Sequence, residues 1–316
     1  MMEIVITDGY TLNPGDLSWK ALNELGKVKY YDRTSAIETV AKCYNADIII
    51  VNKTPITADV IEAAASLQLI AVSATGYNNI DTTAAAKRNI KVCNVPAYGT
   101  YSVAQHVFAL LLHLTNHVSM NAASVSNGEW QAAKDWCYSI QPVMELKDKV
   151  FGIVGFGKIG KQVATIAQAF GMKVIHHGGR ESLDNIQPVS LHELFMQSDV
   201  VSLHCPLTKD NKGFVNKELL GLMKSTSFLI NTARGLLINE KDLGLALHQG
   251  RLAAAALDVL STEPPGKNNP LIGLTNCVIT PHTAWISAEA RGRIMQVTLE
   301  NIQAFLRGAP QNVVTV

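Results

Sequence analysis

The chain has 316 residues, of which 47% are hydrophobic and 17% charged, a composition typical of a globular protein with room for two domain cores. Its formal net charge is +1, so composition does not indicate a nucleic-acid or membrane-surface partner, and we expect neither. The five cysteines are scattered without a CxxC pair, which indicates neither a disulfide framework nor a zinc site; we expect buried free thiols in a cytoplasmic protein.

Short β-rich runs alternate with helix-like segments over the first 99 residues. The expected strands are "EIVITD", "VKYYD", "ADIIIVN", "LQLIAVSA" and "IKVCNV". Between them lie helical patterns such as 57–67 and 81–88, which begin with threonine or aspartate. This alternation predicts βαβ units and a parallel sheet.

A long apolar helix is expected from Tyr101 to about Ser119. Its apolar face is broad for a helix that covers one side of a sheet, which favours burial between domains or between subunits. His106, His113 and His117 are spaced by seven and four residues and would share one face of this helix. A metal site is one interpretation, but no carboxylate lies at ligand spacing, so we favour a polar stripe and expect no metal.

A second series of βαβ units follows a looser stretch at 126–142. Its strand-like runs are "KVFGIVG", "MKVIHH", "DVVSLHC", "TSFLINT", "AAAALDVL" and "NCVITPH". Six strands separated by helices match a complete doubly wound nucleotide-binding domain. The last segment, 287–308, is an amphipathic helix without a following strand, so we expect it to pack back onto the first block. The sequence predicts an α/β protein of two doubly wound parallel-sheet domains, residues 1–99 with 286–316 and residues 100–285.

The stretch "GIVGFGKIG" contains G-x-G-x-x-G, formed by Gly155, Gly157 and Gly160, between an expected strand and an expected helix. In that context the pattern strongly indicates a dinucleotide site. Gly155 would permit the tight turn, Gly157 the approach of a pyrophosphate, and Gly160 close packing of helix on strand. The helix N-terminus would offer free N–H groups to the phosphates. A glycine-rich turn without a ligand is the alternative.

Ionisable residues follow three later strands: Arg234, Asp258 with Glu263, and His282. Ligands of an open parallel sheet bind outside the carboxyl ends of its strands. Arg234 can hold a carboxylate in a bidentate fork, and His282 can give a carbonyl oxygen its proton as hydride reaches the carbon. Glu263 can orient the imidazole, so the set suits reduction of a 2-oxo acid. The alternatives are a surface ion pair for Arg234, a solvated acid for Glu263 and a helix cap for His282.

Four stretches carry a resemblance to a known family: "ELKDKVFGIVGFGKIG", "DVVSLHCPLT", "LINTARGLLINEKDLGLALHQGRLAAAALDVLSTEPP" and "NPLIGLTNCVITPHTAW". In order and spacing they resemble the D-isomer-specific 2-hydroxyacid dehydrogenases. "NKTPIT", "SATGYNNID" and "VCNVPAYGTYSVAQH" look most like the glycerate dehydrogenases and hydroxypyruvate (glyoxylate) reductases of that family. The resemblance implies a Rossmann dinucleotide domain inserted into a flavodoxin-like substrate domain, and a homodimer.

The resemblance also implies roles for individual residues. Arg234 would bind the substrate, His282 would be the acid/base, and Glu263 would support it. Thr75 and Gly76 would capture the substrate carboxylate with backbone N–H groups. Residues on the pyrophosphate, adenosine and nicotinamide parts of the cofactor would be Gly155, Gly157, Lys158, Ile159, His204, Cys205, Pro206, Thr208, Thr232, Ala233, Arg234, Asp258, His282 and Ala284.

The stretch "KVIHHGGR" lacks the acid that the dinucleotide pattern places after the second strand to hold the ribose of NAD. The residues there are Gly178, Gly179 and Arg180. Gly178 does not repel a 2′-phosphate, and Arg180 can pair with it through charge-assisted hydrogen bonds. Only one of His176 and His177 can face the pocket, because side chains alternate along a strand. We therefore expect NADP to be preferred and NAD to be possible; the alternative is that Glu181 holds the ribose.

These features predict an NADPH-dependent oxidoreductase that reduces hydroxypyruvate or glyoxylate to the D-2-hydroxy acid. A dehydrogenase for a lactate-like or bulkier substrate is the alternative within enzymes. The alternative outside enzymes is a cofactor-sensing corepressor-like interaction protein, which would share the fold and the motifs. Such a protein would be expected to carry disordered tails that bind its partners.

Overall fold

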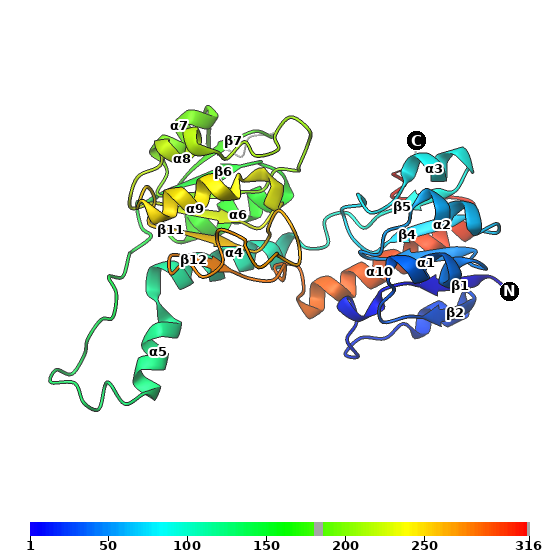
Figure 1. Cartoon of the computed structure of the whole chain (residues 1–316), viewed down its shortest axis with the longest axis horizontal. Helices are drawn as coiled ribbons and strands as arrows, with labels where there is room; N and C mark the ends of the chain where they lie inside the picture. The colour runs from blue at the N-terminus through cyan, green and yellow to red at the C-terminus, as the bar shows by residue number, and fades with distance from the viewer. Residues whose placement is uncertain (180–185, 315–316) are drawn as a thin grey trace. The chain divides into compact units, whose positions relative to one another are not determined.

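The computed structural model describes residues 1–179 and 186–314, and its chain divides into two compact units (Figure 1). Unit 1 is Met1–Gly99 with Ile286–Val316, and unit 2 is Thr100–Trp285. Each unit is built on one parallel sheet, so the predicted α/β class with two parallel-sheet domains is confirmed. No helix in the described part of the chain is long and apolar enough to cross a bilayer.

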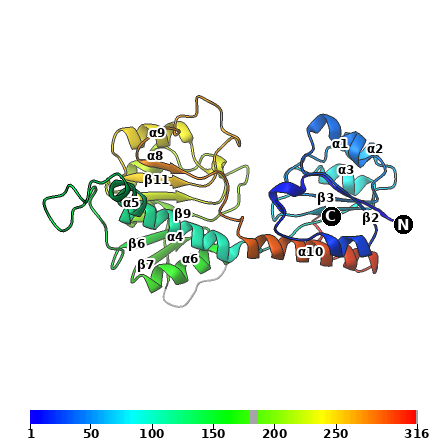
Figure 2. The same cartoon turned by 90° about the horizontal axis from the view of Figure 1, so that it is seen from below.

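Unit 1 has a five-stranded parallel sheet of order β2-β1-β3-β4-β5. The strands are β1 (Glu3–Ile6), β2 (Lys27–Tyr30), β3 (Ile48–Val51), β4 (Leu69–Val72) and β5 (Lys91–Cys93). The helices are η1 (Gly9–Thr11), η2 (Lys20–Glu24), α1 (Ala36–Cys43), α2 (Ala58–Ala63), α3 (Thr82–Lys87) and α10 (Ala288–Leu306). Figure 2 shows α1, α2 and α3 on one face of this sheet and α10 on the other. The apolar strands thus have two covered faces, as parallel sheets require.

The C-terminal helix α10 packs back onto the first block, as expected from its lack of a following strand. Ile302 of α10 lies in one apolar cluster with Ile4 and Ile48. Arg291 is only 6% exposed, and its guanidinium donates to both carboxylate oxygens of Asp16 over 2.7 and 2.6 Å. This bidentate pair ties α10 to the loop between η1 and η2.

Unit 2 has a seven-stranded parallel sheet of order β12-β11-β10-β9-β6-β7-β8. The strands are β6 (Val150–Val154), β7 (Lys173–His177), β8 (Gln187–Pro188), β9 (Val200–Leu203), β10 (Phe228–Asn231), β11 (Ala254–Leu257) and β12 (Cys277–Ile279). The six expected strands are present, and the seventh, β8, was missed. It has only two residues, one of them proline, so it carries no strand-like pattern.

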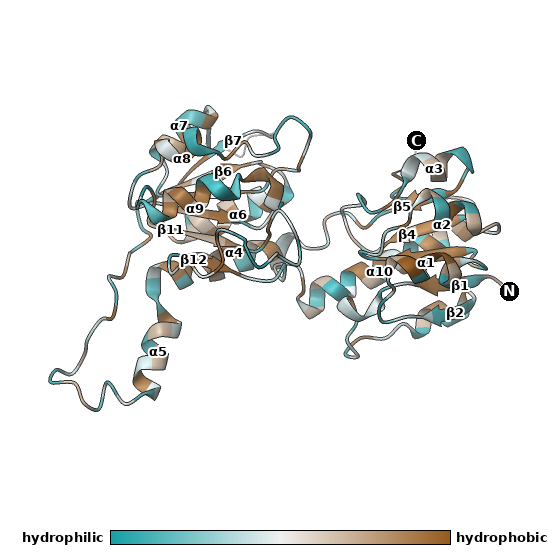
Figure 3. Cartoon of the chain, viewed as in Figure 1, coloured by the Kyte–Doolittle hydropathy of each residue, from teal (hydrophilic) through white to brown (hydrophobic). Residues whose placement is uncertain are grey.

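Helices cover both faces of the unit 2 sheet. The helices of unit 2 are α4 (Thr100–Asn116), α5 (Val118–Ser126), α6 (Lys158–Ala169), α7 (Leu191–Gln197), α8 (Lys217–Leu222), η3 (Gly235–Leu237) and α9 (Glu240–His248), of which α5 projects away from the sheet. Figure 2 shows α4 and α6 on one face and α8 and α9 on the other. Leu194 of α7 packs in the cluster formed by α8 and α9. In Figure 3 the interior strands of the sheets are among the hydrophobic, brown parts of the ribbon.

The expected helix from Tyr101 to Ser119 is wrong at its end. Residue His117 takes a left-handed backbone conformation, with φ of 50°, so α4 stops at Asn116 and α5 begins at Val118. The apolar face of α4 is not reserved for another domain, since Val107 and Leu111 pack in the core between α6 and the sheet of unit 2. Because His117 lies beyond α4, the three histidines do not form one stripe on that helix. The described residues contain no cluster of three potential metal ligands.

The cysteines are not uniformly buried, contrary to our expectation. Cys43 and Cys93 are buried, and burial raises their pKa values to about 12 and about 11. Cys205 and Cys277 are half-buried. Cys137 is exposed because it lies in the loop after α5, outside both helix layers.

Candidate functional site

The glycine turn after β6 has the geometry of an anion-binding cradle. Gly155 has a φ of +95°, and a Cβ there would lie 2.5 Å from the backbone nitrogen of Cys205. A Cβ on Gly160 would lie 2.4 Å from the carbonyl oxygen of Gly155. A Cβ on Gly157 would meet nothing within 4 Å, and no side chain caps α6 at this residue. The N–H groups at the start of α6 are therefore open to a phosphate.

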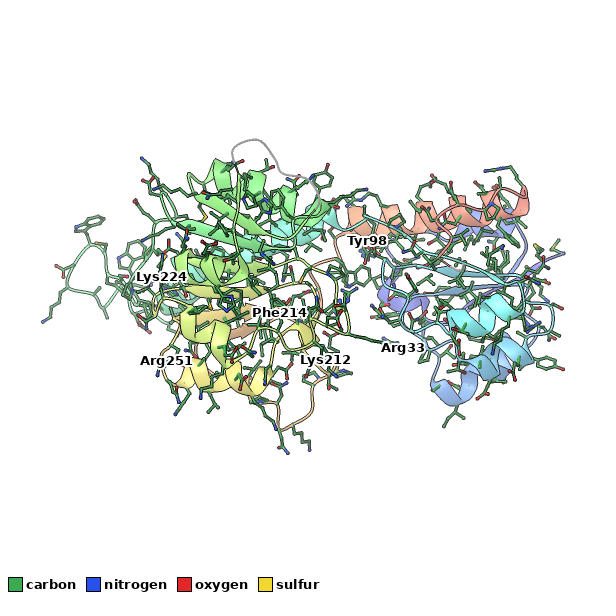
Figure 4. All side chains as sticks on the ribbon, turned by 90° about the horizontal axis from the view of Figure 1, so that it is seen from above. Arg33, Tyr98, Lys212, Phe214, Lys224 and Arg251 are labelled. Carbon is green, nitrogen blue, oxygen red and sulfur yellow. The ribbon has the colours of Figure 1, made fainter. Side chains whose placement is uncertain are left out.

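A cavity of about 530 Å³ lies beside this turn, at the carboxyl ends of β6, β7 and β9. It is lined by Val154, Gly155, Phe156, Gly157, His177, Gly178, Gly179, Leu191, His204, Cys205, Pro206, Asp210, Asn211 and Phe214. The direction of strand addition reverses between β6 and β9, which is where doubly wound sheets bind ligands. Phe214, labelled in Figure 4, comes from the loop between β9 and α8.

Most of the predicted adenosine-side residues meet in this cavity, but three do not line it. Lys158 and Ile159 begin α6, and Thr208 exchanges hydrogen bonds with Asn211, whose side chain reaches the cavity wall. Sequence reasoning missed the cavity-lining residues Phe156, Leu191, Asp210, Asn211 and Phe214. Phe156 occupies a variable position of the glycine pattern, and the others come from segments brought together only by the fold.

The cavity wall next to Gly155 is neutral at physiological pH. Burial lowers the pKa of His204 to about 3, and the hydroxyl of Ser202 lies 2.8 Å from its Nε2 atom. Burial also raises the pKa of the Cys205 thiol, which therefore stays protonated. A thiol is a poor nucleophile, so Cys205 is suited to form a wall of the cavity.

The two neighbouring histidines at the end of β7 lie on opposite sides of the strand, and one of them faces the cavity. His176 is 4% exposed, and its ring stacks on Phe156 with centroids 4.1 Å apart. His177, on the other side of the strand, lines the cavity. Gly178 and Gly179 follow with φ of +76° and +104°, a backbone that side chains other than glycine rarely adopt. Arg180 and Glu181 lie outside the described residues.

Arg234 stands at the end of β10 on a tightly braced turn. The Asn231 side chain accepts a hydrogen bond from Ala233 N and donates one to Arg234 O, both over 2.9 Å. The next residue, Gly235, packs directly on the backbone of Leu260 in the neighbouring loop, where a Cβ would not fit. This packing leaves the Arg234 side chain exposed, with one guanidinium nitrogen 2.7 Å from Ala233 O.

His282 and Glu263, which follow β12 and β11, are in direct contact. The Nδ1 atom of His282 lies 2.6 Å from Glu263 Oε2, and the other carboxylate oxygen accepts from Leu260 N over 3.0 Å. An ionised carboxylate only accepts hydrogen bonds, so Nδ1 carries a hydrogen and Nε2 is left for another partner. The imidazole side chain is 30% exposed and can be reached by a small ligand.

Asp258 was expected near the nicotinamide, and the structure shows it buried beneath His282. It is 1% exposed, and its carboxylate accepts from Thr280 Oγ1 over 2.6 Å, Thr283 N over 2.8 Å and Ala284 N over 2.9 Å. His106 of α4 reaches the same network through Thr280 Oγ1, over 3.1 Å. Asp258 therefore holds the backbone turn that carries His282.

Thr232 offers a polar group that the protein leaves unsatisfied. Its hydroxyl is buried at the carboxyl end of β10 and has no hydrogen-bond partner among the described residues. A buried hydroxyl without a partner is costly unless a ligand or water completes it. Together with the uncapped start of α6, it makes unit 2 fit a dinucleotide.

Thr75 and Gly76 lie in unit 1, in the loop after β4. The Thr75 hydroxyl donates to Val95 O over 2.8 Å, and the Asn94 side chain donates to Thr75 O over 2.8 Å. These bonds tie the loop to the segment after β5. The loop lies at the carboxyl edge of its own sheet, where parallel sheets bind ligands.

Comparison with known proteins identifies the family. Residues 108–284 match the model of the D-isomer specific 2-hydroxyacid dehydrogenase NAD binding domain. A hydroxypyruvate reductase from Blautia hydrogenotrophica is 45% identical over 99% of both chains. A glycerate dehydrogenase from Methylorubrum extorquens is 37% identical over 95% of both chains.

A solved structure gives the same answer for the fold. An acyclic imino acid reductase in complex with NADPH and D-Arg superposes with a TM-score of 0.87 and 36% identity, covering 99% of this chain and 100% of that one. The chain belongs to the D-isomer-specific 2-hydroxyacid dehydrogenases, and it is an NAD(P)-dependent enzyme of that family.

Proposed function

We propose that this enzyme reduces hydroxypyruvate or glyoxylate to the D-2-hydroxy acid with NADPH. The observation that carries the chemistry is the 2.6 Å contact between His282 Nδ1 and Glu263 Oε2. It fixes the imidazole tautomer so that Nε2 is available for proton transfer. The choice of substrate is supported by the hydroxypyruvate reductase that is 45% identical along nearly the whole chain.

The residues at the three strand ends divide the reaction between them. The Arg234 guanidinium binds the substrate carboxylate and polarises the neighbouring carbonyl. His282, as an imidazolium, gives its Nε2 proton to the carbonyl oxygen. The neutral ring that remains keeps the hydrogen on Nδ1, which stays hydrogen-bonded to Glu263. The bound nicotinamide supplies the hydride that reaches the carbonyl carbon. Glu263 stabilises the imidazolium before the proton leaves.

The backbone of the loop at Thr75 and Gly76 binds the substrate carboxylate in this proposal. Neither residue lies in a helix or a strand, and the hydroxyl of Thr75 is already engaged with Val95 O. Their amide N–H groups make no hydrogen bond with another described residue. Free amides of successive residues are a common way to hold an anionic group.

We assign unit 1 as the substrate domain and unit 2 as the dinucleotide domain. The proposed cofactor contacts run from the cradle to the strand ends that follow β10 and β12, and include Gly155, Gly157, Lys158, Ile159, Gly178, Gly179, Arg180, His204, Cys205, Pro206, Thr208, Thr232, Ala233, Arg234, His282 and Ala284. Asp258 accepts a hydrogen bond from Ala284 N and so helps to position this proposed contact residue. The absence of an acid at Gly178 and Gly179 supports NADPH over NADH, and an NADPH complex exists for a relative of 36% identity.

We also propose that the enzyme is a homodimer. Helix α5 and the loop that follows it project away from the body of unit 2 (Figure 1). Several large apolar side chains on this segment are solvent-exposed, with Trp136 86% and Val118 66% exposed. A second copy of the chain is the occupant that would cover them in a soluble enzyme. The molar mass measured by light scattering tests this, and a monomer at micromolar concentration would contradict it.

A second candidate function is the reduction of an imino acid. It is favoured by the 36% identical reductase, whose solved complex contains NADPH and D-Arg. An imino acid has the same carboxylate next to the reacting carbon, so Arg234 would serve both substrates. A 2-oxo acid offered with and without an amine distinguishes the two reactions by their products.

Steady-state kinetics on a panel of substrates tests the proposed function. Hydroxypyruvate, glyoxylate and pyruvate are each offered with NADPH and with NADH. We expect the largest kcat/KM for hydroxypyruvate or glyoxylate with NADPH, by about tenfold over NADH, which corresponds to about 1.4 kcal/mol. A clear preference for pyruvate, for bulkier 2-oxo acids or for NADH would overturn it, and no turnover at all would leave a cofactor-sensing binding protein.

A further inference from the structure

His177 is held in place by both its backbone and its ring. Its carbonyl oxygen accepts the N–H of Gly155 over 2.8 Å, so the residue belongs to the base of the glycine turn. Its Nδ1 atom lies 3.0 Å from Val189 O, next to the short strand β8. The ring is therefore fixed at the cavity wall before any ligand arrives.

These contacts determine which ring nitrogen can change its protonation. A backbone carbonyl only accepts hydrogen bonds, so Nδ1 of His177 always carries its hydrogen. The proton that comes and goes is the one on Nε2, and no described residue makes a hydrogen bond to that atom. The neighbouring His176 differs, because its Nε2 is buried with no hydrogen-bond partner among residues 1–179 and 186–314, and its ring is stacked on Phe156.

Several charged and titratable groups lie in the cavity wall or on the helices next to it. His204 stays neutral, because burial lowers its pKa to about 3, and the raised pKa of Cys205 keeps that thiol protonated. Asp210 contributes a carboxylate to the cavity wall, and Lys158 begins α6. On α7, His192 is exposed and Glu193 is bonded to Ser190, and neither lines the cavity. Of the two histidines that line the cavity, His204 has its Nε2 atom on the Ser202 hydroxyl, so His177 is the one whose Nε2 no described residue engages.

We infer that His177 is a specificity-determining residue, which binds the 2′-phosphate of NADPH through a protonated Nε2. This rests on the proposed use of NADPH. A phosphate monoester is close to doubly negative above its second pKa of about 6, so it favours the imidazolium form of a histidine beside it. NADH has a hydroxyl at the same position, and a neutral Nε2 can accept its hydrogen bond. Binding of NADPH therefore takes up a proton, and binding of NADH does not.

The inference predicts that cofactor selectivity depends on pH. Binding coupled to uptake of one proton weakens by up to about tenfold for each pH unit above the range where the histidine is protonated. We expect the ratio of NADPH to NADH affinity to fall by about tenfold or more between pH 6.5 and 8.5.

Isothermal titration calorimetry on the full-length enzyme tests this directly. NADPH and NADH are titrated at pH 6.5, 7.5 and 8.5, in buffers of different ionisation enthalpy, which gives the number of protons taken up. Wild type and His192→Gln should take up a proton with NADPH near pH 7.5, because His192 is exposed and does not line the cavity. His177→Gln should take up none and should lose the pH dependence of the affinity ratio.

The results separate failure of the inference from failure of the proposed cofactor. NADPH preferred at every pH without proton uptake by the wild type would overturn the role of His177 and leave NADPH use intact. Proton uptake that persists in His177→Gln would overturn it as well. Equal affinities for both cofactors at pH 6.5 would overturn both proposals. Absence of proton uptake by the wild type overturns the inference even if the variant fails to fold.

Discussion

The glycine turn after β6 and the loops after β10, β11 and β12 lie at the carboxyl ends of one sheet, but they use their residues in different ways. The turn works through absent side chains: Gly155 and Gly160 make room for backbone, and Gly157 leaves the start of α6 open. The loops work through side chains that other residues hold in position, as Glu263 holds His282. Changes in the turn should therefore alter folding or cofactor binding, whereas changes in the loops should alter the chemical step.

The sharpest test of this contrast is His282→Gln. Glutamine can still bond to Glu263, but it cannot give a proton to the substrate, so we expect kcat to fall by about 10² or more. The NADPH dissociation constant should change far less than kcat, because His282 is one of many proposed cofactor contacts and the glycine cradle is unaltered. Stopped-flow and steady-state assays measure the rate, and fluorescence titration measures cofactor binding.

The matched control for His282 is His248→Gln, an exposed histidine at the end of α9. It should leave kcat unchanged. A His282→Gln enzyme that turns over within a few-fold of wild type would show that another group supplies the proton.

Two glycine variants should separate folding from binding within the turn. In Gly155→Ala the new Cβ meets the backbone of Cys205, and φ is unfavourable for alanine, so we expect a loss of about 1–3 kcal/mol in the free energy of unfolding. In Gly157→Ala the Cβ meets open space, so stability should hold while affinity for the dinucleotide falls by about tenfold or more. Chemical denaturation and cofactor titration measure the two effects.

Gly221→Ala is the control for both glycine variants, because it lies in α8 with nothing within 4 Å of the new Cβ. It should be neutral or slightly stabilising, since alanine favours helix. A loss of stability in Gly157→Ala equal to that in Gly155→Ala would contradict the view that Gly157 serves cofactor binding and not folding.

Arg234→Lys should test whether the loop after β10 binds substrate through geometry or through charge alone. Lysine keeps the charge and loses the bidentate fork, so we expect kcat/KM for the 2-oxo acid to fall by about 10-fold to 100-fold. The exposed Arg251, labelled in Figure 4, provides the control Arg251→Lys, which should have no effect. An unchanged KM and kcat in Arg234→Lys would reject the proposed contact with the carboxylate.

The fold was more accessible to sequence reasoning than the cavity. Short apolar runs predicted every strand of both sheets except β8, because burial of a strand on two faces produces a clear local pattern. The end of α4 before His117 depends on the left-handed backbone conformation of that one residue, which the apolar pattern of the sequence does not predict. The family resemblance placed Asp258 near the nicotinamide, and its position after a strand agreed with a place at the cofactor edge of the sheet. Its hydrogen bonds to residues 280–284 are visible only in the folded chain.

The smallest expected effect comes from Glu263→Gln, which separates the position of His282 from its electrostatic support. The amide oxygen can still accept the Nδ1 hydrogen, so the ring keeps its place, but the negative charge that stabilises the imidazolium is gone. Hydrogen bonds to charged groups are about twice as strong as neutral ones, and the difference of about 1 kcal/mol predicts a roughly five- to tenfold fall in kcat. Glu240 braces the same loop through Ser261 N and the Asn269 side chain, so Glu240→Gln is the matched control. An equal fall of kcat in both variants would mean that loop structure, and not the charge beside His282, limits the rate.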